Sequence, residues 1–213
     1  MDIIVDSNII FSDPMMRSQI WQQLWTHLKK SSCVMLVPEV VKKECISNHL
    51  QHCDKYRGNI VSAAAKLGRL IGQEIEVELP SGETDAPAYL ARWEELLIQG
   101  RVRFLPNPGA GALEDLQNRA IKRLPPFDVK GNGFRDGTIW LSVRNHVRNK
   151  NVDTAFISND RTAYCAKESG GILHPHLQSE IGTAQLLFFT DIGKFLEVAG
   201  EVPVNQFVIE DKA

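Results

Sequence analysis

Four acidic residues lie far apart in the sequence, at positions that a parallel α/β fold would bring to one edge of its sheet. Asp6 and Asp160 each follow a short apolar run that is typical of a buried parallel strand. Glu44 and Asp136 lie in the first turns of two predicted helices. Because ligands bind beyond the carboxyl ends of parallel strands, we expect the four carboxylates to meet at one site.

Carboxylates gathered at one point repel one another unless a divalent cation lies between them. A site with only oxygen ligands and this much negative charge favours Mg²⁺ or Mn²⁺. A hard dication at an acidic site usually acts on phosphates, where it lowers the pKa of a water that then attacks phosphorus. The four residues therefore predict a metal-dependent nuclease, in which they are both the catalytic residues and the metal ligands.

The elements that would position these residues alternate along the chain. Short apolar runs predict strands at residues 3–5, 33–37, 102–105, 154–158 and 186–189. Apolar residues at helical spacing lie between most of these runs, and proline after Asp13 predicts a helix start. This alternation predicts a three-layer α/β/α fold with a central, mostly parallel sheet.

The middle of the chain is expected to be a helical insertion into this fold. We assign residues 1–200 to a single domain that contains the insertion, residues 51–125, and residues 201–213 to a C-terminal strand or tail. The apolar spacing predicts one helix over residues 39–50 and another over residues 61–71.

Composition limits the partners and the compartment. The chain has 213 residues and a formal net charge of −2, so a nucleic acid would have to bind a local basic patch. We expect no signal peptide and no membrane span, because no stretch approaches about 20 apolar residues. The four cysteines have no C-x-x-C spacing, which favours free thiols in a reducing cytoplasm.

The ordered set of acidic motifs resembles the PIN-domain nucleases. Their pattern is an Asp in a strand-end D-[ST]-N, a helical Glu, an Asp that opens a later helix, and a final Asp after a strand ending in [ST]-x-D. The matching segments are Asp6-Ser7-Asn8, Glu44, Phe134-Arg135-Asp136-Gly137 and Ile157-Ser158-Asn159-Asp160. The resemblance covers roughly residues 1–50 and 127–198, and the later segments are similar to a larger bacterial branch of the family.

The resemblance implies hydrolysis of phosphodiester bonds, with RNA favoured over DNA and Mg²⁺ or Mn²⁺ as the cofactor. Side chains that adjoin the acids are expected to bind the substrate. These are Ser7, Asn8, Lys43, Arg135 and Ser158.

Two other classes of function stay open at this point. One is a nucleic-acid-binding or regulatory scaffold that keeps the fold without turnover. The other is a phosphomonoesterase, but the D-x-D motif expected there is absent because residue 8 is Asn. A homodimer or a cognate inhibitor protein is the expected protein partner.

Further residues carry weaker signals. Cys45, His49, His52 and Cys53 match no common zinc spacing, and His174 and His176 read as part of a loop beside the fold. Cations in the predicted insertion could grip a phosphate backbone. They are Arg92, Arg101, Arg103, Arg119, Lys122 and Arg123.

Overall fold

The central layer of the protein is an all-parallel sheet. The computed structural model describes residues 1–166, 171–183 and 185–200, so the strand or tail predicted at residues 201–213 lies outside the described residues. Its strands are β1 (Asp2–Val5), β2 (Met35–Pro38), β3 (Val102–Leu105), β4 (Thr154–Ile157) and β5 (Leu186–Phe189). They are ordered β3-β2-β1-β4-β5, and every neighbouring pair is parallel. The five strands predicted within residues 1–200 are all present, and each of their ends lies within two residues of the predicted end.

The strand order changes direction between β1 and β4. From β1 the chain steps to β2 and β3 on one side, and it returns to β4 and β5 on the other side. The connections therefore diverge between β1 and β4, which is where ligands bind in open α/β sheets. Both strands are buried on both faces, as their continuous apolar sequences require.

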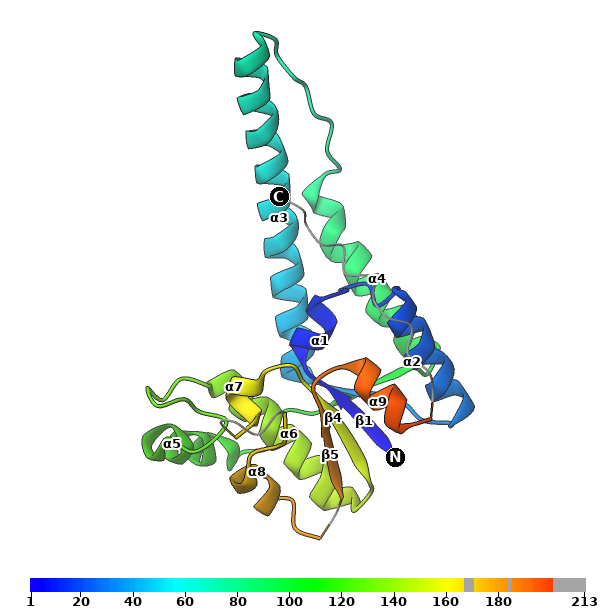
Figure 1. The fold of residues 1–213 in the computed structure, drawn as a ribbon, viewed down its shortest axis with the longest axis vertical. Helices are drawn as coiled ribbons and strands as arrows, with labels where there is room; N and C mark the ends of the chain where they lie inside the picture. The colour runs from blue at the N-terminus through cyan, green and yellow to red at the C-terminus, as the bar shows by residue number, and fades with distance from the viewer. Residues whose placement is uncertain (167–170, 184, 201–213) are drawn as a thin grey trace.

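Helices cover both faces of the sheet and complete the predicted three-layer fold (Figure 1). Helices α2 and α9 pack against each other on one face, and α6, with α5 beside it, lies on the other face. The bounds are α1 (Ser7–Phe11), α2 (Gln19–Lys30), α3 (Glu39–Ile71), α4 (Asp85–Ile98), α5 (Ala112–Lys122), α6 (Phe134–Lys150), α7 (Arg161–Tyr164), α8 (Pro175–Ser179) and α9 (Ile192–Val198). No helix in the part of the chain that the structure describes is long and apolar enough to cross a membrane.

The helix start predicted at Asp13-Pro14 is wrong. Helix α2 begins at Gln19, and the Asp13 side chain instead accepts hydrogen bonds from the main-chain N–H groups of Arg17 at 2.7 Å and Ser18 at 2.6 Å. These bonds hold a turn between α1 and α2. Aspartate followed by proline is favoured in turns as well as at helix starts, and here the turn prevails.

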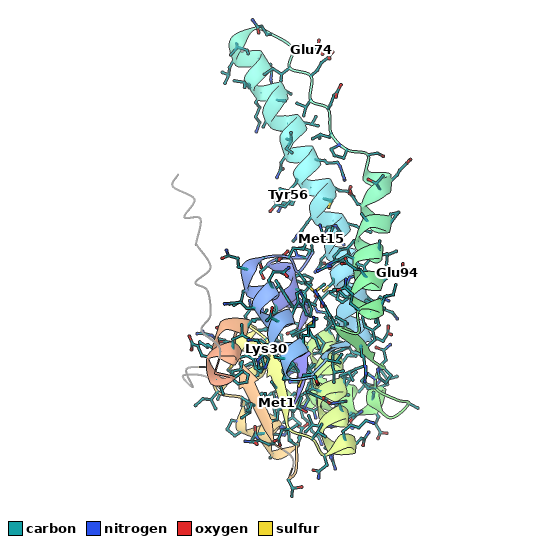
Figure 2. All side chains as sticks on the ribbon, turned by 90° about the vertical axis from the view of Figure 1, so that its right-hand side faces the viewer. Met1, Met15, Lys30, Tyr56, Glu74 and Glu94 are labelled. Carbon is teal, nitrogen blue, oxygen red and sulfur yellow. The ribbon has the colours of Figure 1, made fainter. Side chains whose placement is uncertain are left out.

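The two helices predicted over residues 39–71 are a single helix of 33 residues, α3. Residues 51–59 are mostly polar and have no buried face, but they include no proline, and Gly58 is tolerated inside the helix. Helix α3 ends at Gly72, whose φ of 69° is the left-handed conformation that glycine favours. Its outer half projects beyond the body of the protein, together with the segment that leads back to α4 (Figure 2).

The bounds of the predicted insertion need correction. Strand β3 pairs with β2 inside the central sheet, and α5 packs against α6. Both lie within residues 51–125 and yet belong to the layered core. The part that stands outside the core is the outer half of α3 with its return segment, because these residues have few buried side chains.

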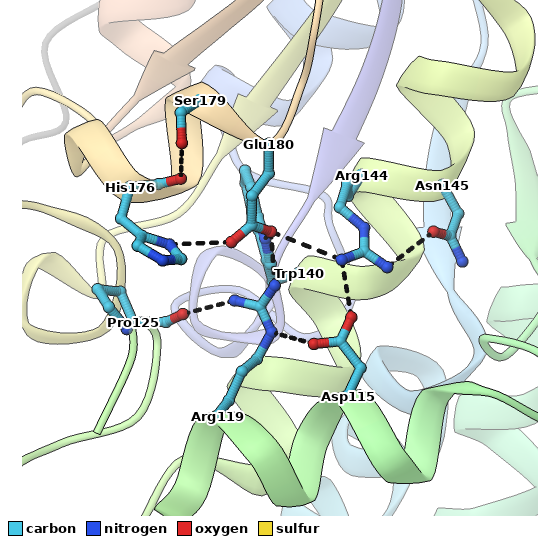
Figure 3. Close-up of polar contacts among 9 residues, drawn as sticks. All are labelled: Asp115, Arg119, Pro125, Trp140, Arg144, Asn145, His176, Ser179 and Glu180. Atoms are coloured by element: carbon cyan, nitrogen blue, oxygen red, sulfur yellow. Dashed lines mark hydrogen bonds and ion pairs between the residues drawn. The ribbon is translucent and has the colours of Figure 1, made fainter. Parts of the chain in front are cut away.

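A buried ionic network joins α5, α6 and α8 (Figure 3). The guanidinium of Arg119 donates to Asp115 Oδ1 at 2.8 Å, to the Pro125 carbonyl at 2.8 Å and to Glu180 Oε2 at 2.6 Å. Trp140 Nε1 donates to the same Glu180 oxygen at 2.9 Å. Arg119 can be buried because each nitrogen of its guanidinium group meets an acceptor. The network holds in place α6, the helix that carries Asp136.

The predicted role of the cations in the middle of the chain, which was to grip a phosphate backbone, needs correction. Arg119 is buried, as is Arg92, which donates to the Met15 carbonyl at 2.8 Å and pairs with Glu95 at 2.6 Å. Arg101 lies over the Trp25 ring at 5.7 Å. These three side chains hold the fold together and are not free to grip a phosphate backbone, whereas Lys122 and Arg123 are exposed.

We predict that Arg119→Ala lowers the free energy of unfolding by about 3 kcal/mol, because it removes the buried cation shared by Asp115 and Glu180 and leaves them Arg144, at 2.8 and 3.6 Å, as their remaining guanidinium partner. Urea denaturation measures the loss. The matched control is Lys122→Ala on the exposed side of the same helix, which should change stability by less than about 0.5 kcal/mol. Equal stability of the two variants would contradict a structural role for Arg119.

Candidate active site

Asp6 is fixed at the end of β1 by donors from both neighbouring segments. Its carboxylate accepts from the Ser7 main-chain N–H at 2.6 Å, Asn8 Nδ2 at 2.9 Å and Ser158 Oγ at 2.6 Å. Burial raises the pKa of Asp6 to about 6, although the bonds from Ser158 and Ser7 oppose the shift. Asp136 and Glu44 add repulsion that raises the pKa of Asp6 further.

Asn8 and Ser158 tie the end of β1 to the end of β4. Asn8 Nδ2 also donates to Ser158 Oγ at 3.1 Å, and Asn8 Oδ1 accepts from the Asn159 main-chain N–H at 3.1 Å. Ser158 is fully buried and Ser7 nearly so. In this structure Ser7 and Ser158 hold Asp6 in place, and their contact with substrate stays a prediction.

Glu44 lies in the second turn of α3, beside Val41 and Cys45, which anchor that turn in the core. Its Oε1 pairs with the Arg135 guanidinium. Its Oε2 is buried and has no hydrogen-bond partner among the described residues. Burial raises the pKa of Glu44, while the Ser7 hydroxyl and the positive charge of Arg135 lower it.

Asp136 lies in the first turn of α6, where Gly133 adopts a φ of 129° to start the helix. Burial raises the pKa of Asp136, and the charge of Asp160 raises it further. Asp160 begins α7, and its side chain accepts from the Ala163 main-chain N–H at 2.9 Å. The predicted ligand Asp160 is therefore also the N-cap of α7.

Tyr164 is a site residue that the sequence analysis missed. Its ring is fully buried, and its hydroxyl donates to the Asp136 carbonyl at 3.2 Å. Burial raises the pKa of Tyr164 well above its ordinary value, and all four acids add to this. The available signal was its position four residues after Asp160, which places both on one helix face.

The structure brings the four acids together in pairs that repel one another. The charges of Glu44 and Asp136 raise the pKa of Asp6. The charge of Asp136 raises the pKa of Glu44, and that of Asp160 raises the pKa of Asp136. Their carboxylates gather at the carboxyl ends of β1 and β4, as the strand order requires. Arg135 is exposed at the edge of this cluster, where it pairs with Glu44, and Lys43 is exposed on α3 next to Glu44 in the sequence.

The donor set suits a hard divalent cation. In the described part of the chain, no three acidic, histidine or cysteine side chains lie close enough to hold one ion directly. The cluster nevertheless consists of carboxylates alone, and the buried Glu44 Oε2 lacks a partner. An oxygen-binding cation would satisfy this atom and offset the mutual repulsion, which is the environment that Mg²⁺ and Mn²⁺ favour.

The raised pKa of Asp6 predicts how stability depends on pH. The folded protein holds a proton that the unfolded chain releases near pH 4, so this contribution is complete below about pH 4 and is lost as pH rises through about 6. We predict that Asp6→Asn removes this pH-dependent loss of stability. Relative to wild type, the variant should gain about 2 kcal/mol between pH 4.5 and 7.5.

Urea unfolding in EDTA at the two pH values measures this difference without bound metal. The control is Asp54→Asn, which removes the same charge from an 80% exposed side chain outside the site. A variant that loses stability relative to wild type as pH rises would show that the Asp6 charge is needed by the fold.

Comparison with known proteins agrees with this geometry. A sequence model of a family described as PIN domain matches residues 3–164, most of the chain and all four acids of the site. No curated protein matches. PIN domains are generally nucleases and typically use divalent metals. With a match over that length and the parallel sheet that carries it, the chain belongs to the PIN-domain family.

Proposed function

We propose that this protein is a Mg²⁺- or Mn²⁺-dependent nuclease that hydrolyses phosphodiester bonds, with RNA favoured over DNA. The observation that carries the proposal is the cluster of Asp6, Glu44, Asp136 and Asp160 at the point where the strand connections diverge. Membership of a family that consists largely of nucleases supports the reaction class. The preference for RNA rests on the family resemblance alone.

Asp6 is the best-positioned ligand. Three neighbouring side chains and one main-chain N–H group hold its carboxylate in one orientation, so binding a cation costs little reorganisation. Glu44 offers its unpartnered Oε2, and Asp136 and Asp160 add charge from the ends of two helices. A bound divalent cation supplies Lewis acidity and an activated water for attack on phosphorus.

Arg135 and Lys43 are the groups that we assign to the substrate backbone. The Arg135 side chain is 57% exposed, so its outer face can meet a phosphate while it pairs with Glu44. Lys43 is exposed on α3 next to Glu44. We further propose a cytoplasmic setting, because the described cysteines are all free thiols, which persist in reducing compartments.

We predict that Asp6→Asn and Glu44→Gln each reduce Mn²⁺-dependent cleavage of a mixed RNA pool at least 100-fold while the fold is kept. Each removes one ionic ligand from the cation site. The matched control is Glu94→Gln on the exposed side of α4, which should keep full activity (Figure 2). Denaturing gels and circular dichroism measure cleavage and folding.

A thermal-shift titration with Mn²⁺ separates the remaining readings. At 100 times the dissociation constant, a bound ion stabilises the wild type by about 2.7 kcal/mol, and Asp6→Asn should lose this gain. Stabilisation without cleavage of RNA or DNA would favour a silent scaffold. Hydrolysis of a small phosphomonoester in place of nucleic acid would favour a phosphatase, and the absence of both effects would refute the cation site.

We predict that Lys43→Gln and Arg135→Gln weaken RNA binding for all sequences alike, because phosphate contacts carry no sequence information. Each should reduce the slope of log affinity against log salt by about 1. Fluorescence anisotropy with the Asp6→Asn background measures binding without cleavage. Lys122→Gln, an exposed change on α5, is the control, and an equal effect of all three would exclude a specific contact.

A further inference from the structure

The outer half of α3 carries an apolar stripe that no described residue covers. Tyr56, Ile60, Leu67 and Leu70 are 62%, 46%, 50% and 85% exposed, and the exposed Ala63 lies between them. Tyr56 lies on the side of α3 that is turned away from α4 (Figure 2). Exposed apolar side chains in one continuous row are uncommon on a monomer and mark an interaction surface.

Another face of the same helix packs against the return segment and the start of α4. The stripe is therefore a separate face of α3 and not an edge of the core. Arg57 binds the Asp85 carboxylate and donates to the Pro80 carbonyl at 3.1 Å. Gly68 is buried against the return segment, where a Cβ would lie 2.5 Å from the Gln73 carbonyl oxygen. Within one turn, therefore, one side of α3 packs on its own chain and the side with Leu67 and Leu70 does not.

The spacing of the stripe identifies the kind of partner. Its members follow one another at intervals of four, three, four and three residues, from Tyr56 to Leu70. A repeat of 3.5 residues keeps one apolar seam facing a second helix and is the signature of helix pairing in a coiled coil. A sheet edge or a flat surface would not require this period.

We propose that α3 pairs with α3 of a second copy of this chain in an antiparallel, two-fold symmetric dimer. In that arrangement Ile60 of one copy packs on Ala63 of the other, and Tyr56 packs on Leu67. Each contact sets a large side chain against a smaller one, and the symmetry repeats every contact twice. The stripe is thus complementary to itself except at Leu70, which this register sets opposite Cys53 of the other copy.

Charge selects the antiparallel direction. The return segment carries Glu74, Glu76 and Glu78, all exposed and without an ion pair to any residue that the structure describes. Parallel helices would set the three glutamates of one copy beside those of the other. The antiparallel pair instead moves Glu74, at the tip, toward the base of the partner helix, where His52 and Lys55 are exposed.

The surface is large enough for a stable dimer. The exposed apolar side chains of the stripe on two copies amount to on the order of 1,000 Å² of surface, at the lower bound for specific interfaces. The paired surface lies outside the active site, because Glu44 lies on the inner turns of α3, inside the core.

Sedimentation of the full-length chain at micromolar concentration tests the dimer. The wild type should sediment as a dimer. The variant Ile60→Glu/Leu67→Glu should be monomeric, with a dimer dissociation constant at least 100-fold higher. The control Ser62→Glu/Arg69→Gln makes the same change in net charge on the polar side of α3 and should remain dimeric. A monomeric wild type, or equal behaviour of the two variants, would overturn the proposal.

Cysteine cross-linking tests the direction in a Cys53→Ser background. Ile60→Cys and Ala63→Cys, each oxidised alone, should give no disulfide dimer, and a mixture of the two should give one. Dimers that form from either variant alone would show a parallel pair. A mixture without any cross-link would contradict the proposed register.

Discussion

The burial of the Asp6 carboxylate is the constraint around which the rest of the site is arranged. An ionised group in that place is costly, and burial moves its pKa toward neutrality. Donors from the adjoining turn and from the end of β4 offset part of that cost. The same donors join the two strand ends, so the binding position and the centre of the sheet have one geometry. A side chain held in this way has little freedom left to lose when a cation arrives.

The other acids depend on packing at some distance from the sheet. Asp136 is placed by α6, and α6 is held in turn by the contacts of Trp140 and Arg119 with Glu180. Gly137 follows Asp136 because a Cβ there would lie 2.6 Å from the Leu116 side chain. The site therefore draws on two kinds of support, hydrogen bonds at the strand ends and a buried ionic layer behind α6.

Sequence patterns predicted the features that are encoded locally. Continuous apolar strands and acids placed directly after them were recognisable, because strand burial and turn chemistry leave short-range signatures. Features that depend on distant partners were not. Arg119 and Arg92 look like solvated cations until Glu180 and the Met15 carbonyl are seen beside them. Tyr164 looks like a core aromatic, since only the fold shows which carboxylates surround its hydroxyl. The unbroken length of α3 was missed because its polar middle has no buried face to mark it.

Glu44 and the tip of α3 belong to one uninterrupted helix, which makes that helix a mechanical lever. With a rise of 1.5 Å per residue, the tip stands about 40 Å from Glu44. A tilt of about 5° at the base would therefore carry the tip through about 3.5 Å, and a load on the tip would return to Glu44 as a rotation within the core. A partner that binds the outer end of α3 would therefore restrict or shift the position of the Glu44 carboxylate. The two ends of α3 are too far apart to interact chemically, but the rigid helix couples their motion.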